Sequence, residues 1–246
     1  MASLKQLAVC IGLPQSFSVV GHFFGYASPP PWNLAASQGS LPQSLSLLTH
    51  MKRLQQTHFH LNLIRVGASS FDGLLNAVDE QNLDCAVQIT RDIYAAVGIG
   101  IGRVERWWMI QETSYETIDD DCEAEDLVDE YTVPNNGVDC FFVQMWVGTV
   151  AGLTPSGGDG VVVESRENTY LGTARTMAHE LGHFFGLDTG GTDGVGHQNN
   201  TPSNLMCQSK SAKTMPSGEV AIPGSTQLNS NQIATIKAHD AMKGAC

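Results

Sequence analysis

The segment YLGTARTMAHELGHFFG, residues 170–186, constrains the fold of this chain more than any other stretch. Its apolar residues recur at helical spacing, which predicts an amphipathic helix with a broad apolar face. The residues on that face are Ala174, Met177, Ala178, Leu181, Phe184 and Phe185. Gly186 lies where the helix has to end if the chain is to bring another residue back to it.

Two histidines of this helix are placed to hold a metal ion. His179 and His183 are four residues apart, so their rings share one helical face, with Cβ atoms about 5–6 Å apart. This spacing suits two imidazole nitrogens that bind one zinc ion. Glu180 follows the first histidine and is placed to take a proton from a zinc-activated water and pass it to a leaving amine. The pattern predicts a catalytic zinc site with Glu180 as the general base.

The segments around this helix predict an α/β or α+β domain. Residues 58–66, 99–110, 137–148 and 161–165 have the composition of strands. Helical spacing of apolar residues extends over 76–98, where Gly98 is a natural stop. A last helix is expected over 230–243, with Ser230 as its N-cap and Lys243 and Gly244 at its end. The order of the elements is strand, helix, three strands, helix, irregular loop and helix.

The string HELGHFFGLD, followed by SNLM, resembles the metzincin clan of zinc endopeptidases, with the matrixins and snapalysin-like enzymes as its nearest members. His179, Glu180, His183 and Gly186 match the clan's motif HExxHxxGxx(H/D), and Met206 matches the methionine of its Met-turn. The resemblance covers about residues 57–246. It implies a twisted mixed sheet with an active-site helix, a Met-turn and a C-terminal helix. It also implies a zinc-dependent endopeptidase that acts on proteins or peptides.

The sequence departs from the clan at Thr189, where the third metal ligand would be His or Asp. A glycine-rich loop follows and contains His197, whose imidazole would complete a set of three histidines. We therefore expect His197 to be the third ligand. Asp188, Asp193 and a site with only two protein ligands remain as alternatives.

Two further expectations concern the sheet. By analogy with the clan, residues 160–165 (GVVVES) are expected to form an antiparallel edge strand along the cleft. Such an edge can pair with an extended peptide through main-chain hydrogen bonds. His58 and His60 share one face of a strand but lack a third partner, so a structural role is expected for them.

Composition restricts the partners and the environment. A net charge of −12 disfavours nucleic acid and anionic membrane surfaces. No apolar run reaches the roughly 18 residues that cross a bilayer. The chain is expected to act as a monomer. Six cysteines and an acidic surface favour a secreted protein, and the resemblance suggests a disulfide between Cys207 and Cys246. The carboxylates of residues 117–134 are a candidate calcium site, although no EF-hand loop matches.

Residues 1–55 are expected to be a leader or strap, either a signal or a pro-segment, and residues 56–246 the catalytic domain. Two other functions remain open. One is a degenerate metzincin-like fold that acts as a non-catalytic binding module. The other is a gluzincin-type zinc hydrolase, in which a distant glutamate such as Glu219 is the third ligand.

Overall fold

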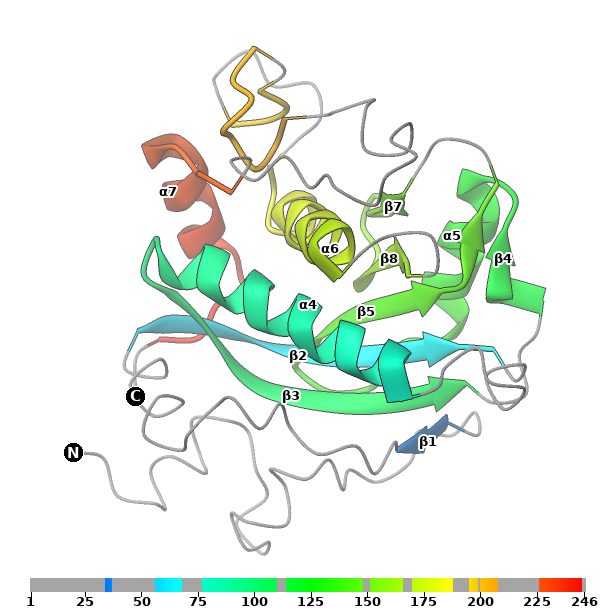
Figure 1. Ribbon diagram of the computed structural model, residues 1–246. Helices are drawn as coiled ribbons and strands as arrows, with labels where there is room; N and C mark the ends of the chain where they lie inside the picture. The colour runs from blue at the N-terminus through cyan, green and yellow to red at the C-terminus, as the bar shows by residue number, and fades with distance from the viewer. Residues whose placement is uncertain are drawn as a thin grey trace, which may run out of the picture.

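A six-stranded sheet with helices on both faces forms the body of the protein (Figure 1). The computed structural model describes residues 34–36, 56–67, 77–109, 114–147, 151–165, 170–187, 195–198, 200–207 and 226–244. The sheet has the strand order β1-β3-β2-β5-β8-β7. Its strands are β1 (Leu34–Ala36), β2 (Thr57–Val66), β3 (Ile99–Met109), β5 (Val138–Val143), β7 (Gly152–Leu153) and β8 (Gly160–Glu164).

The sheet is mixed, which confirms the predicted α/β class. The four central strands β3, β2, β5 and β8 run parallel to one another, whereas β1 and β7 pair antiparallel at the two edges. Two short strands, β4 (Thr117–Ile118) and β6 (Met145–Trp146), form a separate parallel pair. The 3-10 turn η2 (Ser114–Glu116) leads into β4.

Four α-helices complete the described fold, and three of them pack on the sheet. α4 (Ala77–Ala95) and α6 (Tyr170–Phe184) lie side by side on one face, and α5 (Asp121–Glu130) packs on the other. α7 (Ser230–Ala238) lies beyond the C-terminal end of α6 (Figure 1). α6 is thus supported by both the sheet and α4, and it provides a firm base for its two histidines.

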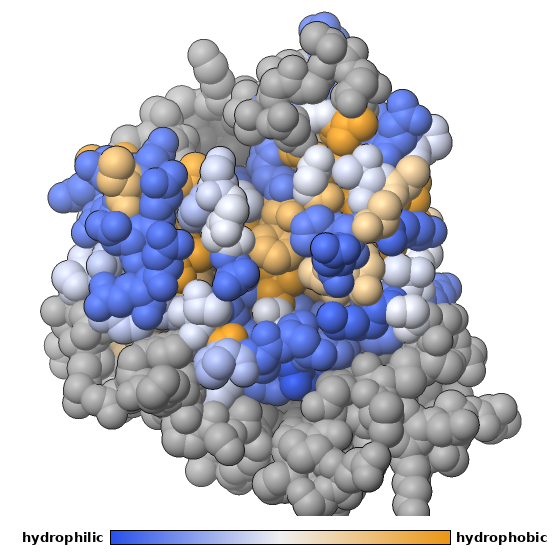
Figure 2. Space-filling model, turned by 180° about the vertical axis from the view of Figure 1, so that it is seen from behind, coloured by the Kyte–Doolittle hydropathy of each residue, from blue (hydrophilic) through white to orange (hydrophobic). Residues whose placement is uncertain are grey.

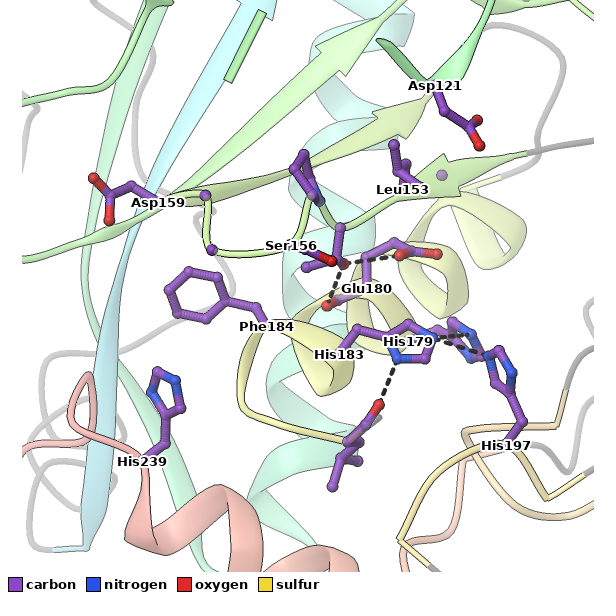
Figure 3. A pocket seen from close by; sticks show the side chains of 16 residues that line it. Asp121, Leu153, Ser156, Asp159, His179, Glu180, His183, Phe184, His197 and His239 are labelled. Carbon is purple, nitrogen blue, oxygen red and sulfur yellow. Dashed lines mark hydrogen bonds between the residues drawn. The ribbon is translucent and has the colours of Figure 1, made fainter. Parts of the chain in front are cut away.

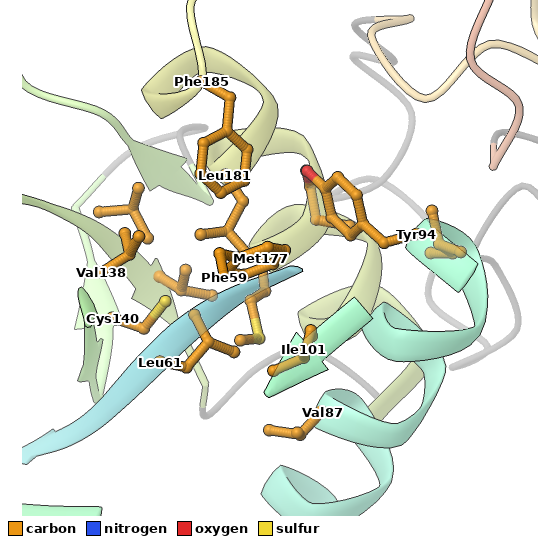
Figure 4. Close-up of a cluster of buried hydrophobic side chains, with 14 of the residues drawn as sticks. Phe59, Leu61, Val87, Tyr94, Ile101, Val138, Cys140, Met177, Leu181 and Phe185 are labelled. Carbon is orange, nitrogen blue, oxygen red and sulfur yellow. The ribbon is translucent and has the colours of Figure 1, made fainter. Parts of the chain in front are cut away.

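Alternation along the strands divides the core in two, because successive side chains of a strand point to opposite faces. On β2, Phe59, Leu61 and Leu63 face α4 and α6, whereas Ile64 and Val66 face α5. The parallel strands are buried on both faces, as expected where helices cover a sheet from two sides. Figure 4 shows the larger of the two clusters, in which Met177, Leu181 and Phe185 of the α6 segment meet the strands.

Two buried hydroxyl groups of α4 hold α6 in place. Tyr94 donates to the carbonyl of Ala178 at 2.8 Å, and Thr90 donates to the carbonyl of Ala174 at 3.2 Å. The ring of Tyr94 also packs edge-on against Phe59, with centroids 5.5 Å apart. A buried hydroxyl without a partner is costly, so these bonds favour one position of α6 along α4. Ala178 directly precedes His179, and this contact therefore fixes the helix at the candidate site.

The structure corrects the expected edge strand. Residues 160–164 form β8, which pairs with β5 on one side and with β7 on the other. β8 is therefore an inner strand, which explains why its valines are buried, and the antiparallel edge strand is β7. The error arose because Gly152 and Leu153 lie in a glycine-rich stretch that has the composition of a loop.

The last helix also differs from its prediction. Asn229, and not Ser230, is the N-cap, because its side chain accepts from the backbone N–H of Gln232 while Gln232 bonds back to the N–H of Asn229. The helix ends at Ala238, five residues before the expected end at Lys243. Lys243 instead exchanges two backbone hydrogen bonds with His58, of 3.0 and 2.7 Å.

The face seen from behind is mainly hydrophilic, with apolar side chains visible between the polar ones (Figure 2). Within the described residues, no helix is long and apolar enough to cross a membrane. No disulfide joins the described side chains of Cys122, Cys140 and Cys207. Cys246 lies outside the described residues, so its pairing with Cys207 stays a prediction.

Candidate metal centre

Three imidazole rings meet at one end of α6. The Nε2 atom of His183 lies 3.1 Å from Nε2 of His179 and 3.0 Å from Nε2 of His197. His179 and His183 come from α6, and His197 comes from the loop 195–198 (Figure 3). The three ligating atoms lie within 4.8 Å of one another. The structure therefore brings together the three histidines that the sequence predicted as metal ligands.

Backbone carbonyls determine which nitrogen of two rings carries a proton. Nδ1 of His179 lies 2.9 Å from the carbonyl of Leu205, and Nδ1 of His183 lies 2.5 Å from the carbonyl of Leu187. A carbonyl can only accept, so both Nδ1 atoms donate, and in the neutral rings both Nε2 atoms are unprotonated. Two nitrogen lone pairs then face each other with no proton between them.

The end of α6 places the carbonyl that His183 uses. The N–H of Gly186 donates to the carbonyl of His183 at 2.9 Å, and the N–H of Leu187 donates to that of Gly182 at 3.0 Å. This pair of bonds is a Schellman cap, which needs a left-handed residue at Gly186. Its φ of +90° suits glycine and strains any residue with a Cβ. The cap turns the chain back so that the Leu187 carbonyl faces the ring of His183.

A buried turn lies directly beneath α6. Met206 is fully buried in this turn, and its Sδ would be 2.8 Å from a Cβ added at Gly182. The glycine between the two helical histidines is therefore needed for close contact with the methionine. Arg175 lies one helical turn before His179 and donates to the carbonyls of Leu205 and Cys207. Leu205 is thus held by both a guanidinium and the imidazole of His179.

The donor set suits a zinc ion. Three imidazoles are a common ligand set of catalytic zinc, which keeps a fourth position open for a reactant. Histidines that bind a metal usually donate their other ring N–H to a carbonyl or carboxylate, as His179 and His183 do here. A cation at the common point of the three Nε2 atoms would also relieve the opposed lone pairs. The three histidines can therefore bind a metal ion.

Glu180 lies in the same pocket and is held by Thr154. The Thr154 hydroxyl lies 2.8 Å from the backbone carbonyl of Glu180 and 2.9 Å from its Oε2. Gly152 approaches so closely that an added Cβ would be 2.9 Å from Cγ of Glu180. Burial raises the pKa of the Glu180 carboxyl to about 7, while the Thr154 hydrogen bond and the charge of Arg175 act to lower it. Glu180 is therefore a buried, oriented carboxyl that can exchange a proton near neutral pH.

The pocket at this site has a volume of about 670 Å³. One wall is the segment from Gly152 to Asp159, which contains β7, and the opposite side carries the three histidines. Phe184 and His239 line it at a distance from these rings, with their own ring centroids 5.3 Å apart. An edge strand thus borders the cavity that contains Glu180.

Several predicted residues lie outside the described part of the chain, namely Asp188, Thr189, Asp193 and Glu219. Among the described residues, the three histidines are the only group of His, Cys, Asp and Glu with metal-ligand spacing. No calcium cluster is found in the described part of the acidic segment 117–134. Sequence reasoning missed Thr154, Arg175 and the edge strand β7, since no local pattern distinguishes these residues from ordinary loop or helix positions.

Comparison with known proteins adds little. The sequence matches no family model and no curated protein. Among solved structures, metalloproteinase II from Bacteroides fragilis has a TM-score of 0.46 and 15% identity, over 75% of this chain and 53% of that chain. A chain of a chaperone–substrate complex has a TM-score of 0.42 and 14% identity, over 57% of this chain and 26% of that chain. The protein thus spans about half and about a quarter of these two chains. Both likenesses are distant, and neither bears on function.

Proposed function

We propose that the protein is a zinc-dependent endopeptidase, with His179, His183 and His197 as metal ligands and Glu180 as the general base. The main support for this proposal is that three Nε2 atoms lie close together. Two of these atoms belong to rings whose Nδ1–H groups donate to backbone carbonyls. In this tautomer the Nε2 atoms of His179 and His183 cannot hydrogen-bond to each other, and a shared cation would satisfy both. A carboxyl group beside such a centre is what a hydrolase needs and a purely structural site does not.

The residues divide the reaction between them. The three imidazoles would hold the zinc ion, which would supply a nucleophilic water near neutral pH and a Lewis acid for the substrate carbonyl. Glu180 takes a proton from the attacking water and delivers it to the leaving amine, which is general base and then general acid catalysis. Thr154 holds the carboxyl of Glu180 by its hydroxyl at 2.9 Å. Burial of Glu180 keeps bulk water from competing for this proton.

Peptides are the substrates that suit the pocket best. β7 lies at the sheet edge, where it pairs with β8 through Gly152 and Leu153, and it borders the pocket. Among the described strands, none pairs with its outer side, where an extended chain could bind. Main-chain hydrogen bonds to such an edge hold a peptide without regard to most of its side chains. Contact between Gly152 and the Glu180 side chain brings the paired peptide near the base. A sheet edge beside the pocket thus favours proteins and peptides over small amides as substrates.

Chelation and reconstitution test this proposal. Treatment with phenanthroline should abolish cleavage of casein, and one equivalent of zinc should restore it. Glu180→Gln should bind zinc as the wild type does and yet cleave casein about 10²- to 10⁴-fold more slowly. Cleavage that continues after complete removal of the metal would refute the mechanism. Zinc binding without any cleavage by the wild type would instead identify a non-catalytic binding module.

A further inference from the structure

The third histidine lies in a loop, and its position depends on a helix about 35 residues further along the chain. Gln232 of α7 is fully buried. Its Nε2 lies 3.1 Å from the carbonyl of Val195 and 3.4 Å from that of Gly196. Both carbonyls belong to the residues just before His197. One amide side chain therefore holds the loop that carries the third ring.

The orientation of this amide follows from its backbone partners. Its Oε1 accepts from the backbone N–H of Asn229 at 2.9 Å, and a backbone N–H can only donate. The other terminal atom must then be nitrogen, which agrees with the two carbonyls that face it. A flipped amide would oppose like groups on both sides. Gln232 thus has one orientation, and in that orientation it donates to the loop.

A second buried amide completes the link. Asn204 donates to Oε1 of Gln232 at 2.9 Å, and Gln232 donates to Oδ1 of Asn204 at 3.1 Å. Oδ1 of Asn204 also accepts from the backbone N–H of Met206 at 2.9 Å. The Met206 carbonyl in turn accepts from the N–H of Gln198 at 3.1 Å. Residues on both sides of His197 are therefore tied to the turn beneath α6.

We propose that Gln232 is the positioning residue for the third metal ligand, so that α7 fixes the site through one side chain. This inference rests on the proposed function in that it takes His197 as a ligand. Gln232 does not line the pocket. Its hydrogen bonds reach the His197 loop directly, through the carbonyls of Val195 and Gly196, and indirectly, through Asn204. The oxygen and the nitrogen of its amide both have their full number of hydrogen-bond partners. The Gln232 side chain therefore cannot move without breaking a buried hydrogen bond.

Two reciprocal variants separate this role from ordinary support of α7. Gln232→Glu keeps the acceptor for the N–H of Asn229, and a capping box accepts either residue, so the helix cap survives. It also replaces the donor by an oxygen that repels the loop carbonyls. Asn229→Ala removes the side chain that caps the helix but leaves the Gln232 amide in place. The first variant breaks the link to His197, and the second breaks only the cap.

Zinc affinity in competition with a chromophoric chelator is the first readout. Gln232→Glu should weaken it by roughly 10- to 100-fold, the effect expected from loss of an outer partner of a metal ligand. Asn229→Ala should lower the Tm by roughly 2–4 °C and leave zinc affinity unchanged. Equal zinc affinity in Gln232→Glu and the wild type would overturn the inference. So would a loss of affinity in both variants in proportion to their loss of stability.

Amide hydrogen exchange of the zinc-free protein keeps the inference testable without metal. The N–H of Gln198 should exchange faster in Gln232→Glu than in the wild type, and at the wild-type rate in Asn229→Ala. An unchanged rate in Gln232→Glu would refute the link. A wild type that binds no zinc would refute the proposed function, while exchange at Gln198 would still decide whether Gln232 holds the loop.

Discussion

Two groups of histidines lie close together in the part of the chain that the structure describes, and they differ in what their ring nitrogens face. In the α6 group, His179 and His183 both give their Nδ1 protons to carbonyls and turn bare Nε2 atoms towards each other. In β2, the rings of His58 and His60 lie 5.3 Å apart, but Nδ1 of His60 accepts from the backbone N–H of Arg103 at 3.1 Å. The proton of the neutral His60 ring is then on Nε2, and its Nδ1 lone pair is already used. His58 and His60 therefore do not direct two lone pairs at a common point.

The charges near the two groups differ as well. Burial lowers the pKa of both His179 and His60 to about 3, so the pKa does not distinguish a metal site from a structural pair. Glu180, next to His179, contributes a carboxyl to the first group. Arg103 and Lys243 lower the pKa of His60 further, and Arg175 does the same for His179, so a nearby cation does not separate the two groups. Ring tautomer and a carboxyl in the same pocket therefore mark the candidate metal site better than histidine spacing does.

The largest expected effect is on kcat, when the carboxylate beside each group of histidines is replaced. Glu180→Gln should lower kcat by about 10²- to 10⁴-fold because the proton acceptor is lost while the ligands stay. Glu105→Gln, in the ion pair with Arg103 on β3, should leave kcat unchanged. Steady-state cleavage of a fluorogenic peptide measures both. Equal kcat in Glu180→Gln and the wild type would remove Glu180 from the reaction.

Removal of one ring from each group should affect zinc very differently. His197→Ala should weaken zinc binding by roughly 100-fold or more, beyond what loss of an outer partner causes. His60→Ala should leave zinc affinity unchanged and reduce only the free energy of unfolding, since a buried ring is lost. Chelator competition gives both affinities. Equal zinc occupancy of His197→Ala and the wild type would pass the role to Asp188 or Asp193.

Acid should destabilise the zinc-free fold through its buried histidines, and His60 of β2 should account for part of this effect. The pKa of His60 is about 3 in the folded protein and about 6.5 in the unfolded chain. The unfolded state therefore binds more protons between these values, and His60 stabilises the fold above pH 6.5 and loses that contribution as the pH falls. From pH 7 to pH 5 this loss is about 2 kcal/mol. Urea unfolding at both pH values should show a smaller decrease for His60→Leu, and an equal decrease would contradict the assignment.

The smallest expected effect compares two glycines at helix ends. Gly186 and Gly98 have φ values of +90° and +74°, and each has room for a Cβ, so alanine should cost about 1 kcal/mol at either position. Only Gly186→Ala should also weaken zinc binding, by roughly tenfold, because it shifts the Leu187 carbonyl that His183 uses. Equal zinc affinity in both variants would show that the helix cap at Gly186 does not influence zinc binding.

The sequence predicted what local patterns determine. The periodicity of apolar residues predicted α6 and the buried central strands, and the spacing of His179 and His183 predicted that they share one helical face. The three-histidine arrangement could be anticipated because the loop after Gly186 offered one further imidazole. Composition could not reveal β7, since two residues in a glycine-rich stretch form a strand only through their pairing with Val162 and Val163. The link from Gln232 to the His197 loop spans 36 residues and depends wholly on tertiary structure.

The most direct test of the metal centre is an anomalous difference map at the zinc edge from crystals of the zinc-saturated protein. The account predicts a single strong peak about 2.0–2.1 Å from the Nε2 atoms of His179, His183 and His197. Nδ1 of His179 and of His183 should keep their carbonyl partners. A peak bound by only two of these histidines, a peak at another group of residues, or no peak at all would contradict the account.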